Sequence, residues 1–138
     1  MIRTVDEYHE SLKAMKPNVY MGGEVLGRDN LPGTDIMDLT IELAHNKELQ
    51  QLTTAKSHLS GETISRFCHI HQSVEDLLAK QEMTRTACRL VGGCIARCMG
   101  IDAMNSLSVI TYQCDQAHGT DYHQRFLEYL KYLSLIHI

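Results

Sequence analysis

Hydrophobic residues recur three and four positions apart along much of the chain, which is the spacing of one face of a helix. The pattern predicts helices over residues 4–15, 35–45, 73–97, 101–116 and 121–132. Thr4 and Glu7 match a capping box at the start of the first helix, and Ser73 and Asp76 match another at the start of the third. Pro17 ends the first helix. The chain is therefore expected to be mainly α-helical.

Two short extended runs interrupt this pattern near the N-terminus. Residues 18–26 predict one small extended hairpin, because Gly22-Gly23 supplies a flexible turn between the two runs. Residues 27–33 predict a loop, and the polar residues 50–61 predict a mixture of helix and loop. Gly92-Gly93 is unfavourable within a helix, by about 1 kcal/mol per glycine relative to alanine, so either a helix ends there or the backbone approaches another group closely.

Composition narrows the class of protein. The chain has 138 residues, enough for one domain, and a net charge of −4. No basic patch indicates nucleic-acid binding, and no apolar run is long enough for a membrane span or a secretory signal. The five cysteines are an odd number without a regular framework, which argues against a disulfide-stabilised fold. We therefore expect a protein of a reducing, cytoplasmic compartment that binds neither nucleic acid nor a membrane.

The C-terminal residues 133–138 match the translation of a common sequencing-library adapter end. We expect them to be an artefact and exclude them from functional reasoning, His137 included, as one would exclude a fusion scar. Residues 1–132 would then be the front of a longer protein whose gene was cut after Tyr132.

The candidate chemistry lies in the segment Cys94-Ile95-Ala96-Arg97-Cys98. On a helix, residues four apart share a face with Cβ atoms roughly 5–6 Å apart, so two thiolates here can point into one cavity. This separation suits an iron–sulfur cubane, whose cysteine ligands bind different iron atoms. Zinc would draw both sulfurs onto one ion, with bonds of about 2.3 Å. Both metal centres need four ligands, so Cys94 and Cys98 alone complete neither.

Buried packing is the alternative for these thiols, because cysteine often behaves as a small hydrophobic residue. Their helical stripe also contains Ala87, Leu90, Val91 and Ile101. On spacing alone, packing without a metal is the more common outcome for Cys94 and Cys98. The other cysteines, Cys68, Cys88 and Cys114, match no ligand spacing and are expected to be packing residues.

Four further residues are weaker candidates. His69 and His71, beside Cys68, form a possible second metal cluster, although a His-x-His pair in a polar stretch is more often a surface or capping feature. Arg66 and Arg97 could bind phosphates or an acidic partner. For each arginine, a solvated charge or an ion pair at the edge of the core is the more common role.

Longer motifs carry a family resemblance. They are residues 18–24, 71–73 with Asp76-Leu77, 94–105, Thr111-Tyr112, Asp115-Gln116, 119–123 and 126–132. From Tyr8 to Tyr132 the chain resembles the N-terminal region of the 4-hydroxybutyryl-CoA dehydratase (vinylacetyl-CoA delta-isomerase) family, within the 4-hydroxyphenylacetate 3-hydroxylase superfamily of flavoenzymes. The cysteine pair with its Gly-Ile-Asp-Ala continuation is the most specific part, because the oxygen-using monooxygenases of this superfamily lack those thiols.

The resemblance implies a fold and a set of cofactors. The fold resembles that of acyl-CoA dehydrogenases, and residues 1–132 would form most of the N-terminal α-helical domain. The dehydratases bind FAD and a [4Fe-4S] cluster held by three cysteines and one histidine, and they act as homotetramers. Cys94 and Cys98 match two of the cysteine ligands. The remaining ligands, most flavin contacts and the catalytic bases are expected outside this chain, which would be inactive alone.

The implied activity is dehydration of 4-hydroxybutyryl-CoA to crotonyl-CoA, with isomerisation of vinylacetyl-CoA to the same product. In the family, one-electron oxidation by the flavin makes the β-hydrogen acidic, and a cluster iron is the Lewis acid for the leaving hydroxyl. Ala96 stands where the dehydratases usually have Gln, and Gly22 replaces a bulky residue, so another hydroxyacyl-CoA stays open as the substrate. Two alternatives remain: a flavin-dependent aromatic 3-monooxygenase, and a non-enzymatic helical module with core or zinc-binding thiols.

Overall fold

The computed structural model describes the backbone of residues 2–95 and 97–136, and the side chains of these residues up to Leu133. In chain order the elements are α1 (Val5–Lys13), β1 (Val19–Met21), β2 (Glu24–Leu26), the 3-10 helix η1 (Arg28–Asn30), α2 (Thr34–His45), α3 (Gln50–Thr53), β3 (Thr54–Lys56), β4 (Thr63–Ser65), the 3-10 helix η2 (Arg66–Cys68), α4 (Val74–Val91), α5 (Arg97–His118) and α6 (Tyr122–Ile136). The prediction of a mainly α-helical fold is confirmed.

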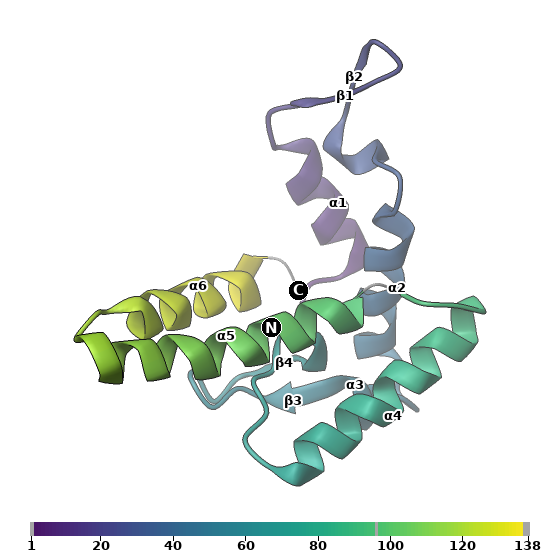
Figure 1. The fold of residues 1–138 in the computed structure, drawn as a ribbon. Helices are drawn as coiled ribbons and strands as arrows, with labels where there is room; N and C mark the ends of the chain where they lie inside the picture. Colours follow the sequence, from purple (N-terminus) through teal and green to yellow (C-terminus); the bar gives the residue numbers. More distant parts are fainter. Residues whose placement is uncertain (1, 96, 137–138) are drawn as a thin grey trace.

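The helices form a body from which one hairpin projects (Figure 1). Helices α5 and α6 lie side by side and pack more extensively than any other pair of elements. Helix α4 diverges from α5 at the connection that joins them, and the segment from α3 to η2 contacts both helices between them. The β1–β2 hairpin projects beyond the far ends of α1 and η1.

Local sequence signals explain the helix starts. In α1, the Glu7 N–H donates to Thr4 Oγ1 at 3.2 Å and the Thr4 N–H donates to Glu7 Oε2 at 2.9 Å, so the predicted capping box is confirmed. At the start of α4, the Asp76 N–H donates to Ser73 Oγ at 3.2 Å. The Asp76 carboxylate, however, accepts from the Gln72 N–H at 3.0 Å instead of returning to Ser73. The predicted cap residue, Ser73, is confirmed, but the Asp76 carboxylate bonds to the N–H of the residue before the cap and not to the cap itself.

The helix boundaries around residues 92–100 differ from the prediction. Helix α4 ends at Val91, because Gly92 adopts the left-handed conformation, with φ 69°, and its N–H donates to the Cys88 carbonyl. Helix α5 then begins at Arg97 and contains Gly100. The expected helix over residues 73–97 therefore ends six residues early, and the alternative that a helix ends at Gly92-Gly93 is confirmed. The next helix starts earlier than residue 101.

A second hairpin was missed. Strands β3 and β4 pair antiparallel, with Thr54 opposite Ser65 and Lys56 opposite Thr63, where the sequence predicted helix mixed with loop. The Leu59 N–H donates to Ser57 Oγ at 3.2 Å, which helps to close the turn. Each strand has only three residues and few large hydrophobic side chains, so the alternation that predicts a strand was too short to recognise.

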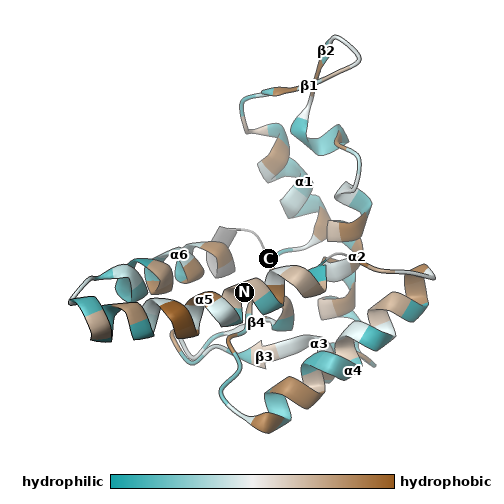
Figure 2. Ribbon diagram, in the orientation of Figure 1, coloured by the Kyte–Doolittle hydropathy of each residue, from teal (hydrophilic) through white to brown (hydrophobic). Residues whose placement is uncertain are grey.

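Two buried clusters form the core. The main cluster comprises Leu43, Ile64, Phe67, Cys68, Met83, Ala87, Ile95 and Ile101. A smaller cluster of Ile70, Phe126 and Leu130 anchors α6. Hydrophobic side chains also remain exposed, for example Leu78, Leu90 and Ile110. Figure 2 shows hydrophobic segments, in brown, on each of the helices α4, α5 and α6. Within the described residues, no helix is sufficiently long and apolar to cross a membrane.

Helix α6 continues to Ile136, beyond the predicted end at Tyr132. Residues 133–136 of the segment expected to be adapter-derived are therefore helical, and His137 and Ile138 lie outside the described residues.

Candidate metal centre

Cys94 and Cys98 flank the start of α5 and do not share one helix. Cys94 lies in the connection after α4 and is exposed, whereas Cys98 lies in the first turn of α5 and is half-buried. The expectation that both thiols stand on one helical face is wrong, because Gly92 ends α4 before Cys94 is reached. The position of each sulfur is therefore set by a different structural element. Ala96, between them, lies outside the described residues.

The two thiols nevertheless interact. The pKa of Cys98 is raised, first by burial and then by a hydrogen bond with the Cys94 side chain. Cys88, near the end of α4, adds a smaller electrostatic contribution in the same direction. All five cysteines are described, and none of them forms a disulfide. The pair is thus present as two neighbouring thiols at the edge of the fold.

Ile95 and Arg97, which lie between the two cysteines, face the protein interior. Ile95 is almost completely buried in the main core cluster with Met83 and Ile101. Arg97 places its guanidinium over the Phe67 ring, 5.5 Å from the ring centroid. These two contacts hold the segment against the core while Cys94 stays accessible to a ligand from outside.

This donor set fits part of an iron–sulfur centre. Two adjacent thiols, one exposed and one at the surface edge, can both ligate once deprotonated. The described residues contain no group of three or more Cys, His, Asp or Glu side chains arranged to hold a metal ion. A cubane needs four ligands, and the role of Cys94 and Cys98 as two of them stays a prediction.

The two histidines of the weaker candidate lie near each other. His69 is buried, with Nε2 3.0 Å from Asp76 Oδ2, and neither of its ring nitrogens meets the geometry of a hydrogen bond to a described residue. His71 lies 6.4 Å from His69, measured between ring centroids. Arg66 also pairs with Asp76, at 3.2 Å, so the prediction of an ion pair at the edge of the core is confirmed for this arginine.

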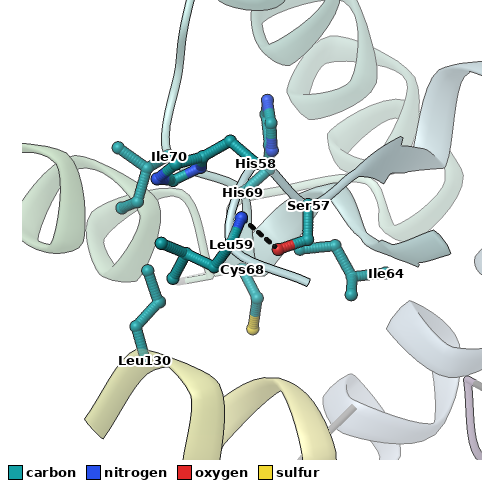
Figure 3. Close-up of a pocket in the computed structure, with 8 residues that line it drawn as sticks. All are labelled: Ser57, His58, Leu59, Ile64, Cys68, His69, Ile70 and Leu130. Atoms are coloured by element: carbon teal, nitrogen blue, oxygen red, sulfur yellow. Dashed lines mark hydrogen bonds between the residues drawn. The ribbon is translucent and has the colours of Figure 1, made fainter. Parts of the chain in front are cut away.

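A small cavity lies beside His69 (Figure 3). It lies between Ser57, Ile64, Cys68 and Leu130, with the His69 ring at its wall. Its volume of about 10 Å³ has room for one water molecule at most. It is too small for a cofactor or an organic substrate.

The remaining cysteines are placed largely as predicted. Cys68 is buried in the main core cluster, and burial raises the pKa of its thiol to about 11. Cys88 is half-buried and packs against the same cluster. Cys114 is half-buried on α5. Arg97 differs from its prediction, because it stacks on Phe67 and forms no ion pair within the described residues.

Comparison with known proteins assigns the chain to a family. A family model described as the N-terminal region of 4-hydroxyphenylacetate 3-hydroxylase matches residues 4–135. The chain belongs to this family.

Two known proteins are similar to this chain over almost its whole length. The chain is 41% identical over 139 residues to the 4-hydroxybutyryl-CoA dehydratase/vinylacetyl-CoA-Δ-isomerase of Clostridium aminobutyricum, which aligns 97% of this chain with 28% of that protein. The solved structure of the oxygen-tolerant archaeal 4-hydroxybutyryl-CoA dehydratase from N. maritimus superposes with a TM-score of 0.86 at 38% identity, over 98% of this chain and 28% of that one. The resemblance seen in the sequence is confirmed, and this family member spans little more than a quarter of either relative.

Two polar residues of the site region were not singled out from the sequence. Asp102 pairs with Lys80 of α4, and Asn105 hydrogen-bonds to the backbone at His69 and His71. Both residues belong to the motif over residues 94–105, so the signal was present. Their partners lie more than twenty residues away in the sequence, which is why spacing did not reveal them.

Proposed function

We propose that this chain is the N-terminal part of a hydroxyacyl-CoA dehydratase that converts 4-hydroxybutyryl-CoA to crotonyl-CoA and isomerises vinylacetyl-CoA. The observation that carries the proposal is the neighbouring thiol pair, Cys94 and Cys98, in a chain 41% identical to an enzyme of that name. Residues 1–132 are the N-terminal helical domain, and residues 133–138 are adapter-derived. The complete enzyme carries FAD and a [4Fe-4S] cluster, acts as a homotetramer and resides in the cytoplasm, where thiols stay reduced.

Cys94 and Cys98 bind the cluster, and the other two ligands come from outside the described residues. When bound, the cluster supplies a Lewis-acidic iron for the leaving hydroxyl, and the flavin supplies redox chemistry that makes the β-hydrogen acidic. The chain's own contribution is to orient the thiols. Ile95 anchors the connection that carries Cys94, and α5 presents Cys98 at the surface edge of the same core.

The test uses the complete enzyme, expressed and purified without oxygen. We expect about four iron atoms per protomer and formation of crotonyl-CoA from 4-hydroxybutyryl-CoA. Cys94→Ser and Cys98→Ser should each lose most of the iron. Cys114→Ser is the matched control, because it removes another half-buried thiol of α5, and it should keep the iron. Anaerobic protein without iron would overturn the cluster assignment.

A second candidate is a flavin-dependent aromatic 3-monooxygenase, which is favoured by the description of the family model that matches residues 4–135. In that case the thiols are incidental, and the enzyme hydroxylates a phenol in the presence of oxygen and reduced flavin. The same preparation decides between the two, because hydroxylation of 4-hydroxyphenylacetate by iron-free protein would replace the dehydratase proposal. We favour the dehydratase because both relatives carry that name.

A further inference from the structure

Polar side chains of α5 tie this helix to α4 one turn after Cys98. Lys80 Nζ lies 2.6 Å from Asp102 Oδ1, and this contact joins the two helices across their angle. The Lys80 side chain is only 14% exposed, although the Asp102 side chain is 60% exposed. A lysine with so little exposure is held in one geometry by its partner, so the ion pair restricts how the helices move relative to each other.

Asn105, three residues further along α5, makes a second tie. Its Oδ1 accepts from the His71 N–H at 2.8 Å. Its amide nitrogen donates to the Ile101 carbonyl at 2.9 Å and to the His69 carbonyl at 3.4 Å. One side chain therefore satisfies backbone groups both in α5 and in the segment that leads into α4. These hydrogen bonds fix the rotation of α5 about its own axis and its position along that axis, relative to the segment that leads into α4.

These ties matter for the thiols because the two sulfurs are held by different elements. Cys94 is positioned by the connection after α4, which is anchored by Ile95. Cys98 moves with α5, in which Asp102 and Asn105 follow one and two turns later. A small rotation of α5 would move Cys98 away from Cys94 without breaking any bond in the connection between them.

We propose that Asp102 and Asn105 are positioning residues for the Cys94–Cys98 pair, because they fix α5 at the orientation in which both thiols reach one ligand. This inference rests on the proposed function for its biological meaning, and its geometric content can be tested without the cluster. Neither residue touches the substrate or the cofactors in this role; each acts through the backbone that carries Cys98.

The first measurement is made on cluster-free complete enzyme with phenylarsine oxide, whose single arsenic binds two thiols that can approach each other. The fraction of phenylarsine oxide binding that is lost in Cys94→Ser measures binding to the Cys94–Cys98 pair. We expect Asp102→Asn and Asn105→Leu each to weaken this binding about tenfold, with far-ultraviolet circular dichroism unchanged. Asp102→Glu, which keeps the charge, should recover most of the affinity. Unchanged affinity in both Asp102→Asn and Asn105→Leu would overturn the proposal.

The second measurement is the rate at which a ferrous chelator removes iron from the anaerobic holoenzyme. Both variants should release iron several-fold faster than the unmodified enzyme. Asp121→Asn is the matched control, since it removes an exposed ion pair with Arg125 at the start of α6, and it should change neither measurement. If the unmodified enzyme holds no iron, the proposed function fails and the arsenical measurement still decides the positioning role. Equal iron release from all the proteins would contradict positioning and leave the proposed function intact.

Discussion

Arg66 and Asp76 form a largely buried ion pair that joins η2 to the start of α4. Arg66 Nη1 lies 3.2 Å from Asp76 Oδ1, and the two side chains are 9% and 22% exposed. The same guanidinium donates to the Leu52 carbonyl at 2.7 Å and to the Thr54 carbonyl at 2.8 Å. Because every one of these partners is fixed by the fold, removing the carboxylate leaves a buried cation without its counter-charge.

This arrangement predicts an acid-sensitive contribution to stability. Burial acts to raise the pKa of Asp76, but the hydrogen bond from the Gln72 N–H outweighs it, together with the neighbouring His69 and Arg66, and the pKa falls from 3.8 to about 2. A carboxylate with a lowered pKa stabilises the folded state above its unfolded pKa. The contribution of Asp76 is therefore complete above about pH 4 and is lost as the pH falls through about 2.

We expect Asp76→Asn to lower the free energy of unfolding near neutral pH by about 2–4 kcal/mol, and to flatten its dependence on pH below about 4. Urea unfolding across this pH range measures both effects. Asp121→Asn provides the control, because that carboxylate is exposed and pairs with Arg125 at the start of α6. Equal loss of stability in both variants would contradict a special role for Asp76.

The cysteines should differ strongly in reactivity. The pKa of Cys68 is about 11 because the thiol is buried, whereas Cys94 is exposed. Since the thiolate is the reactive form, iodoacetamide should modify Cys94 of cluster-free protein at least about tenfold faster than Cys68 near pH 8. Peptide mass mapping over time measures the two rates. In urea the rates should converge, and similar rates in the folded protein would show that Cys68 is accessible.

Ile95 should stabilise both the fold and the thiol pair. It is almost completely buried between α4 and α5, so Ile95→Ala should lower the free energy of unfolding by about 3 kcal/mol. Val109→Ala, on α5, is the control, because Val109 is exposed, and it should change stability by less than about 0.5 kcal/mol. Chemical denaturation of both variants checks the prediction, which fails if the two substitutions cost the same.

The two glycines between α4 and α5 should respond differently to alanine. Gly92 has φ 69°, where a side chain is strained, so Gly92→Ala should destabilise the protein by about 1 kcal/mol. Gly93 has no positive φ, and an added Cβ would meet nothing within 4 Å. Gly93→Ala should therefore be neutral or slightly stabilising, because alanine restricts the unfolded chain. Thermal unfolding compares the two, and a larger cost at Gly93 would refute the assigned cap.

The positions that the sequence predicted well depend on neighbouring residues. The Thr4–Glu7 capping box, the hairpin turned by Gly22-Gly23 and the Ser73 cap all formed as expected. The two caps are decided by side chains that bond to backbone groups within three residues, and the hairpin turn is decided by two adjacent glycines with positive φ, so nothing distant competes with them.

The failures have physical causes too. Periodicity alone did not locate the break at Gly92, because the hydrophobic stripe continues through Cys94 and Cys98 while the helix does not; only the Gly92-Gly93 pair indicated that a helix could end there. A left-handed glycine interrupts the helix without changing the spacing of hydrophobic residues. The β3–β4 hairpin escaped for a related reason, since its three-residue strands are held by pairing and not by a long alternating pattern.

By itself, the amino-acid sequence determined the mainly helical class and the family, and it singled out the two thiols that we propose as ligands, since these follow from residue types and from motifs along the chain. Only the tertiary structure decided that Cys94 and Cys98 belong to different elements, that Arg66 is buried against Asp76, and that Asp102 and Asn105 hold α5 in place. Those outcomes depend on contacts between residues far apart in the sequence, whose geometry exists only once the helices have packed.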